Sequence, residues 1–181
     1  MIENLNTLQI KNYKRIAIIG MPGAGKSTLA RSLGGLLDLP VEHVDLHYWK
    51  AGWQKHTAEE WAAIHVQLIS QPQWIIEGCA LKSSFLERVS AADLVVYLRF
   101  SRIRCLWHVI KRAVLSRFYQ IPDQPVDCPH YLPWRLIKYL WHFDSLLTQI
   151  LLPQAVRLYP NVPIVVIESY KELQKFCELL R

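Results

Sequence analysis

The sequence of 181 residues has no apolar run long enough to span a bilayer, and its first residues lack the basic-then-apolar pattern of a signal peptide. We therefore expect a cytoplasmic protein that does not contact a membrane. No internal repeat or low-complexity linker divides the chain. Its length suits one sizeable core, so residues 1–181 are predicted to form a single domain.

Cysteine is scarce, and none of the four cysteines belongs to a Cys-x-x-Cys pair. The stretch Cys128-Pro-His130 supplies two neighbouring candidate ligands, and two ligands do not make a metal site. This spacing argues against a zinc site or a disulfide framework and favours reduced, structural thiols.

Acidic residues are fewer than basic ones, 15 against 21, which leaves a formal net charge of +6. Such a balance favours anionic partners, either nucleotides or nucleic acid. The sequence shows no zinc finger, clear helix-turn-helix or arginine-rich tail. Direct binding to DNA is therefore supported only by the net positive charge, whereas a sequence motif indicates nucleotide binding.

The motif is a glycine-rich loop between a predicted strand and a predicted helix. The strand is the apolar run 16–19, and one face of the helix is formed by Leu29, Leu33 and Leu36 or Leu37. The loop matches Gly-x4-Gly-Lys-Ser, the phosphate-loop pattern. Glycines let successive backbone N–H groups point at one phosphate chain, and the helix N-terminus adds partial positive charge. The alternative is an incidental glycine turn before a helix.

This loop is predicted to bind ATP and Mg²⁺. Lys26 should reach the β- and γ-phosphates, which makes it a catalytic candidate, and the Ser27 hydroxyl should ligate Mg²⁺. The residues predicted to contact the cofactor are Gly20, Pro22, Gly23, Ala24, Gly25, Lys26, Ser27 and Thr28. Because such a loop contacts phosphates and not the base, it does not distinguish ATP from GTP.

Strand and helix signals alternate along the chain. The strand candidates are residues 16–19, 41–44, 74–76, 94–98 and 162–167. The helices between and after them are marked by the capping box of Thr57 and Glu60, the cap Ser101, and the spans 83–90 and 171–180. This alternation predicts an α/β fold, a parallel sheet with helices on both faces.

The longest insertion separates the fourth and fifth strand candidates. It contains a proline-rich loop over residues 120–132 and a long helix that opens at Pro133 and that Pro153 kinks or restarts. We expect residues of about 112–138 to act as a lid, which would exclude water from the transferred phosphate.

Two carboxylates follow predicted strands, Asp45 after the second and Glu77 after the third. Ligands gather at the C-terminal edge of a parallel sheet, so both are predicted to partner Mg²⁺, through water. Either side chain could instead orient the group that receives phosphate, or cap a turn. Asp45 is the second catalytic candidate.

A basic helix face precedes the proline-rich loop, formed by Arg104, Lys111, Arg112 and Arg117. Phosphoryl transfer needs cations around the migrating group, although most charges on such a face are simply solvated. Arg112, mid-helix and near the end that faces the loop, is the third catalytic candidate.

Aromatic residues gather after Asp45. His47, Trp49 and Trp53 could line a pocket for a base or a sugar, because aromatic faces stack on flat ligands. The alternatives are packing under a surface loop for the two tryptophans and a structural hydrogen bond for His47.

Several of these stretches resemble the adenylate-kinase-like proteins known as DNA topology modulation proteins. The matching motifs are Gly20 to Thr28, His43 to Trp53, Trp74 to Gly78, Leu106 to Arg112, Cys128-Pro129, and Trp134 with Trp141 and Phe143. The likeness covers nearly the whole chain after Lys14. It implies a three-layer P-loop nucleoside- or nucleotide-kinase fold, with parallel strands ordered 2-3-1-4-5 and a helical lid between strands four and five.

Three stretches depart from the pattern of that group. Glu77-Gly78-Cys79 stands where Asp-Gly-Asn is usual, Lys138 stands where an arginine is common, and the residues after Phe143 lack the arginines often found there. Fewer lid arginines would weaken the stabilisation of the transferring phosphoryl group. Nucleotide binding is therefore better supported than fast turnover.

The sequence supports three hypotheses on function. The first is a kinase that transfers the γ-phosphoryl group of ATP to a nucleotide, a nucleoside or another small-molecule acceptor. The second is a nucleotide-dependent regulator of DNA topology or gene expression, and the third is a simple NTPase. The lid-like insertion favours the first. The acceptor, and the choice between a monomer and a dimer, stay open.

Overall fold

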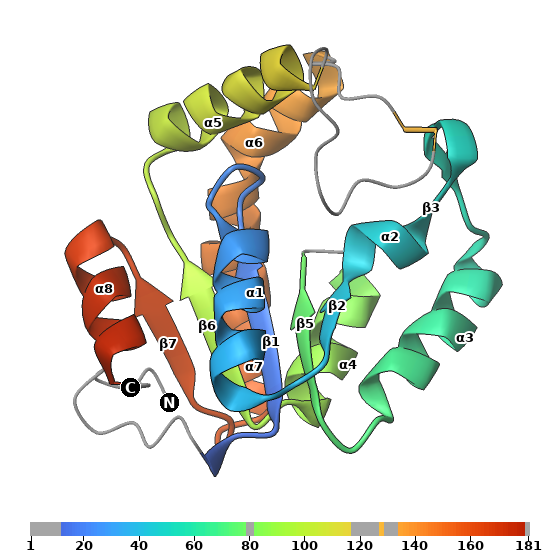
Figure 1. Cartoon of the computed structure of the whole chain (residues 1–181). Coiled ribbons are helices and arrows are strands. Elements are labelled where there is room, and N and C mark those ends of the chain that lie inside the picture. The colour runs from blue at the N-terminus through green and yellow to red at the C-terminus, as the bar shows by residue number, and fades with distance from the viewer. Residues whose placement is uncertain (1–11, 79–81, 117–126, 129–133, 180–181) are drawn as a thin grey trace.

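The computed structural model describes residues 12–78, 82–116, 127–128 and 134–179, arranged as Figure 1 shows. Its centre is a five-stranded parallel sheet with the order β2-β5-β1-β6-β7. The strands are Val41–His43 (β2), Trp74–Glu77 (β5), Arg15–Gly20 (β1), Leu94–Leu98 (β6) and Ile164–Ile167 (β7). In chain order this is 2-3-1-4-5, so the predicted order is confirmed.

The three inner strands are covered on both faces. All residues of β5 and β6 are buried, and so are the residues of β1 after Arg15. A strand buried on both faces shows a continuous apolar run in the sequence and no alternation. The short apolar runs of the sequence are therefore the middle of the sheet.

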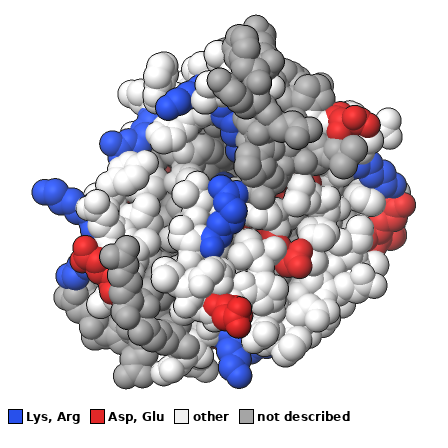
Figure 2. Space-filling view, viewed as in Figure 1, with Lys and Arg blue, Asp and Glu red and all other residues white. Residues whose placement is uncertain are grey.

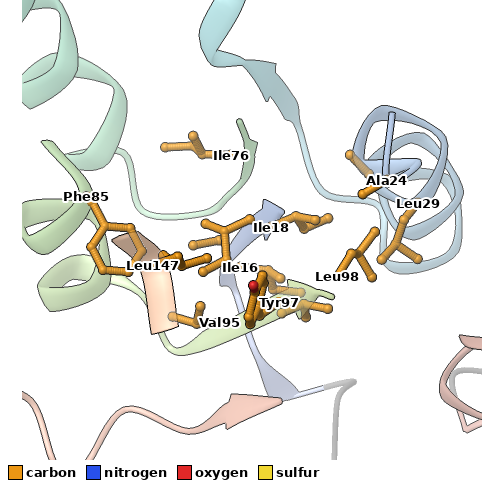
Figure 3. Packing of buried hydrophobic residues seen from close by; sticks show 14 of the residues in the cluster. Ile16, Ile18, Ala24, Leu29, Ile76, Phe85, Val95, Tyr97, Leu98 and Leu147 are labelled. Carbon is orange, nitrogen blue, oxygen red and sulfur yellow. The ribbon is translucent and has the colours of Figure 1, made fainter. Parts of the chain in front are cut away.

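Helices lie on both sides of this sheet. They are Lys26–Leu37 (α1), Ala58–Ile69 (α3), Lys82–Ala91 (α4), Arg102–Leu115 (α5), Trp134–Leu146 (α6), Leu152–Leu158 (α7) and Tyr170–Glu178 (α8). In Figure 3, Leu29 of α1 lies on one side of the β1 side chains. Phe85 of α4 and Leu147 lie on the other side. The molecule thus has the three layers of the predicted fold.

Capping residues mark the first residues of several helices. The Thr57 side chain accepts the Glu60 N–H at 3.1 Å, and the Glu60 carboxylate accepts the Thr57 N–H at 2.9 Å, which confirms the capping box. Ser101 likewise caps α5. On α1, the third residue of the predicted apolar face is Leu37, which packs against the core, whereas Leu36 is 49% exposed.

The region after β2 differs from the prediction. Val44 starts a short helix, Val44–Tyr48 (α2), instead of extending the strand. A hairpin follows, made of Trp49–Lys50 (β3) and Gln54–Lys55 (β4) with the 3-10 turn Ala51–Trp53 between them. Strands of two residues are too short to show an alternating pattern, so the sequence did not reveal the hairpin. Gly52, inside the turn of the hairpin, has a φ of 69°.

The helix after the proline-rich loop continues beyond its proline. α6 passes into the π-helical turn Leu147–Leu151 and then into α7, with Pro153 in the first turn of α7. Pro153 lacks the N–H that would continue the π-helical hydrogen bonds, and the change to the α-helical pattern falls next to it. The predicted restart at Pro153 is confirmed. Pro133, Arg117 and residues 120–126 and 129–132 of the predicted loop lie outside the described residues.

No helix in the described part of the chain is both long and apolar enough to cross a membrane. Figure 2 shows basic side chains over α5, which itself contains no Asp or Glu. In Figure 1 this helix lies above the loop that connects β1 to α1. The basic helix face predicted from the sequence therefore stands next to the phosphate loop.

Candidate functional site

Glycine shapes the loop between β1 and α1. Gly20, Gly23 and Gly25 have φ values of 150°, 83° and 88°, which residues with a side chain rarely adopt. A Cβ atom on Gly23 would overlap the carbonyl oxygen of Cys105, and one on Gly20 would lie 2.6 Å from the carbonyl oxygen of Leu98. Both positions therefore need glycine for packing as well as for conformation.

The contact at Gly23 sets α5 directly on the loop. Cys105 and Val109, the buried residues of α5, are the nearest neighbours of the Gly23 backbone. Only glycine lets the loop and the helix backbone approach so closely. The position of the basic helix relative to the loop thus depends on packing.

The loop wraps around the ammonium group of Lys26. Its Nζ donates a hydrogen bond to the Met21 carbonyl oxygen at 3.1 Å. Pro22 and Ala24 form the wall between these two residues, and Thr28 is exposed in the first turn of α1. No described side chain caps the start of α1, so the first-turn N–H groups are available to an anion. This arrangement suits a phosphate group.

Glu77 joins the loop to β2 through one carboxylate oxygen. Its Oε1 accepts a hydrogen bond from Ser27 Oγ at 2.8 Å and lies 2.8 Å from Nδ1 of His43. The sheet register brings these groups together, because Glu77 pairs with Ile18 of β1 and with His43 of β2. Burial would raise the pKa of Glu77, but the hydrogen bond to His43 and the charge of Lys26 help to bring it below its usual value. Glu77 is therefore a buried, ionised carboxylate.

Asp45 and Arg112 approach this group from α2 and from the last turn of α5. Loss of hydration raises the pKa of Asp45, and the charge of Lys26 acts most strongly against that rise. Loss of hydration also lowers the pKa of Arg112, while the charges of Asp45 and Glu77 oppose it. The charged side chains of Lys26, Asp45, Glu77 and Arg112 are thus close enough to act on one another.

Asp45 and Arg112 both reach solvent, although protein surrounds them on most sides. Because water still contacts both residues, their loss of hydration is partial. Two opposite charges at an accessible place can hold a polar ligand between them.

Oxygen atoms suited to Mg²⁺ lie at this edge of the sheet, on Ser27, Asp45 and Glu77. The described residues contain no group of three or more His, Cys, Asp or Glu side chains placed to hold a metal ion by themselves. Mg²⁺ in nucleotide-binding sites takes few protein ligands, keeps several waters and binds the substrate phosphates. This partial oxygen set fits that kind of ion.

Other candidates lie apart from this group. The Arg104 guanidinium is 4.7 Å from the ring centre of Tyr170 on α8. His47 Nε2 is 2.8 Å from Glu42 Oε2, which is the structural hydrogen bond predicted as its alternative. Arg117 lies outside the described residues. Within the basic helix face, Arg112 is therefore the residue whose charge acts on the carboxylates at the loop.

The aromatic residues of α2 and the hairpin form a packed chain that reaches α3. The ring centres are 5.4 Å apart for Trp53 and Trp49, and 5.0 Å apart both for Trp49 and Tyr48 and for Tyr48 and Trp61. All three contacts are edge-to-face. Packing, one of the two predicted alternatives for Trp49 and Trp53, is what the structure shows.

A cavity of about 240 Å³ lies beside the loop, at the carboxyl ends of β6 and β7. It is lined by Met21, Arg99, Phe100, Ser101, Arg102, Asp144 and Glu168. Arg99 donates to Asp144 Oδ1 at 3.2 Å and to Glu168 Oε1 at 3.0 Å. Met21 belongs to the loop, so the cavity adjoins the place where the loop would hold phosphates.

Sequence reasoning missed three of these residues. Glu168 directly follows β7, so the strand-end rule that selected Asp45 and Glu77 could have found it. Asp144 lies inside α6, where no local signal marks it. His43 becomes the partner of Glu77 only through the register between β2 and β5.

Comparisons with known proteins agree with this picture. The ABC transporter family model matches residues 3–113, which include the glycine loop. Shikimate kinase from Acinetobacter baumannii, solved with shikimate, is 18% identical with a TM-score of 0.56 and 94% of both chains covered. A gluconokinase from Sinorhizobium meliloti 1021 is 16% identical with a TM-score of 0.53, covering 92% of this chain and 91% of its own. No curated protein matches the sequence. At these identities the two structures show a shared fold.

Proposed function

The chain belongs to the family of P-loop NTPases that the ABC transporter model describes, and we propose that it is a kinase that transfers the γ-phosphoryl group of ATP to a small-molecule acceptor. The observation that carries this proposal is the meeting, at one edge of the sheet, of Lys26, Ser27, Asp45, Glu77 and Arg112. The similarity of the fold to shikimate kinase and gluconokinase supports it. From the family we carry over nucleotide binding, and not transport.

The loop would bind the phosphates. Its N–H groups and Lys26 neutralise them, and Arg112 contacts the transferring group, for which a planar guanidinium is well suited. The Ser27 hydroxyl, held by Glu77, would be a ligand of Mg²⁺, which when bound would add positive charge beside the phosphates. The rest of the nucleotide extends toward the cavity beside Met21.

Asp45 would serve the acceptor. Its carboxylate is accessible beyond the loop, and its raised pKa makes it a better proton acceptor than an ordinary aspartate. An acceptor hydroxyl passes its proton to Asp45 while its oxygen bonds to the γ-phosphorus and the bond from that phosphorus to ADP breaks. A neutral hydroxyl suits a carboxylate better than a phosphate would, because two anions repel.

The proposal also includes the domain organisation, the cellular location, the lid and the family resemblance that the sequence predicts. Residues 1–181 form a single cytoplasmic domain, residues of about 112–138 act as its lid, and the chain is a DNA topology modulation protein by resemblance. Regulation of DNA is supported only by the basic side chains over α5. We therefore prefer the kinase over the DNA-dependent regulator and over a simple NTPase.

Replacing Lys26 tests the proposal. Lys26→Ala should lower phosphoryl transfer by about 100-fold or more, because it removes a cation aimed at the transferred group. The assay is transfer from labelled ATP to a panel containing shikimate, gluconate, nucleosides and nucleoside monophosphates. Lys175→Ala, at an exposed position on α8, is the matched control and should transfer like the original protein.

The panel also separates the alternatives. If no acceptor gives product above the Lys26→Ala background, the kinase proposal is wrong. ATP hydrolysis that no acceptor accelerates would instead support a simple NTPase.

A further inference from the structure

The turn of the hairpin is joined to a segment far along the chain. The Trp53 N–H donates to Cys128 Sγ at 3.2 Å, and the Cys128 thiol donates to the Lys50 carbonyl oxygen at 3.5 Å. The Gly52 N–H donates to the Asp127 carbonyl oxygen at 3.1 Å. In Figure 1 the short coloured stretch of residues 127–128 lies beside the turn after β3. We call these three hydrogen bonds the clasp.

The clasp holds a backbone conformation that would not persist alone. Gly52, Trp53 and Asp127 have φ values of 69°, 60° and 51°. A bulky residue such as Trp53 keeps a left-handed conformation only where its surroundings impose it. Cys128 is 1% exposed, and its sulfur accepts the Trp53 N–H in a partly buried position. Because a hydrogen bond that is removed from a partly buried backbone group costs stability, the thiol contributes to the shape of this turn.

The clasp also connects the two sides of the candidate site. The hairpin directly follows α2, which carries Asp45, and Trp53 packs on Trp49 within it. Cys128 lies in the insertion that begins with α5, which carries Arg112. The chain between β6 and β7 is thus tied to the chain between β2 and β5. A change at the clasp would therefore shift Trp53 and Trp49, which directly follow the helix that carries Asp45.

We infer that Cys128 is a positioning residue, which through the clasp holds the hairpin that bounds the acceptor side of the site. This inference rests on the proposed function, since it assigns the Asp45 side to the acceptor. Cys128 touches no reacting group and acts through Trp53 and Trp49. Its loss therefore weakens acceptor binding, while ATP binding, which depends on the loop, is retained.

Three cysteine variants of the full chain test this inference. Cys128→Ala removes the two thiol hydrogen bonds of the clasp, whereas Cys128→Ser keeps a donor and an acceptor in nearly the same shape. Cys177→Ala, on α8, is the control for loss of a thiol elsewhere. Hydrogen–deuterium exchange at the Trp53 amide should be about tenfold faster in Cys128→Ala and close to the original rate in the other two.

Kinetics then separate a positioning role from a merely structural one. With the acceptor found in the panel, Cys128→Ala should raise the acceptor KM about tenfold and change the ATP KM by less than about twofold. Cys128→Ser should restore the acceptor KM.

The Cys128 variants can contradict this inference without contradicting the proposed function that the Lys26 experiment tests. Unchanged exchange at the Trp53 amide in Cys128→Ala overturns the inference, with or without an acceptor. A parallel rise of both KM values overturns it as well, because it indicates general loosening. If the original protein transfers to no acceptor, the proposed function fails and the acceptor role of Cys128 falls with it, while faster exchange would still establish the clasp.

Discussion

One carboxylate oxygen, Oε1 of Glu77, links three elements of the candidate site. It lies 2.8 Å from Ser27 Oγ at the start of α1 and 2.8 Å from His43 Nδ1 at the end of β2. Its donors and the charge of Lys26 compensate for the hydration that burial removes. A neutral amide at position 77 would keep the shape but lose the charge, and charge-assisted hydrogen bonds are about twice as strong as neutral ones.

Glu77→Gln is therefore expected to weaken the binding of Mg²⁺ at the site. The Mg²⁺ concentration for half-maximal ADP production should rise by about 10- to 100-fold, the usual cost of losing a partner that orients a metal ligand. Titration of Mg²⁺ at saturating ATP measures it. Glu42→Gln, which loses only the contact with His47, is the matched control and should behave like the original protein. Identical Mg²⁺ curves for both variants would contradict the link between Glu77 and the metal.

At the scale of the elements, the contact between the β1–α1 loop and α5 fixes where the basic helix lies. Gly23 lies against the backbone of Cys105, so the loop and the basic helix move as a unit unless one of them is distorted. Gly35, in the last turn of α1, offers the opposite case, because an added Cβ there would meet nothing within 4 Å. The same substitution should therefore have opposite effects at these two glycines.

Gly23→Ala should destabilise the protein by about 1–2 kcal/mol from its left-handed backbone alone, and more from the overlap with Cys105. It should also abolish ATP binding. Gly35→Ala should stabilise the protein by about 0.5–1 kcal/mol, since alanine favours a helix interior. Urea unfolding and ATP titration of both variants measure these effects. A Gly23→Ala protein that keeps its stability and binds ATP would show that α5 does not constrain the loop.

The elements themselves were largely predictable from the sequence. β1, β5 and β6 are continuous apolar runs because both of their faces are covered, and the capping box at Thr57 is a local signal. The hairpin after α2 was not predictable, because its conformation depends on hydrogen bonds to Asp127 and Cys128. The sequence identified Asp45 and Glu77 as residues at strand ends near the loop. It did not show which side chains each of them contacts.

At the scale of the whole molecule, a buried polar group between α3 and α4 limits stability in acid. His65 is 0% exposed, with Nδ1 3.1 Å from Oε2 of Glu87. Burial and the charge of Arg88 lower the pKa of His65 to about 4, while Glu87 acts in the opposite direction. In the folded protein the imidazole is therefore neutral at pH values where the unfolded chain protonates it.

Folding stability should consequently fall as the pH decreases from about 6.5 to about 4. In this window the unfolded chain binds a proton that the folded chain does not, which costs about 3 kcal/mol in total. His65→Gln should remove that part of the loss, whereas His108→Gln, exposed on α5, should not. Urea unfolding at pH 7, 5 and 4 (values spanning the window of about 4–6.5) tests this. If His65→Gln loses as much stability as the original protein, another group governs the acid response.

The phosphate loop and the order of strands and helices were determined by the sequence itself, because glycine conformation, a single lysine and continuous apolar runs are properties of neighbouring residues. The tertiary structure alone decided that Glu77 bonds Ser27 and His43, that Arg112 faces the carboxylates while Arg104 lies over Tyr170, and that Cys128 joins the hairpin. These contacts depend on sheet register and on the packing of α5. Both bring together residues that are distant in the chain, so no local pattern records them.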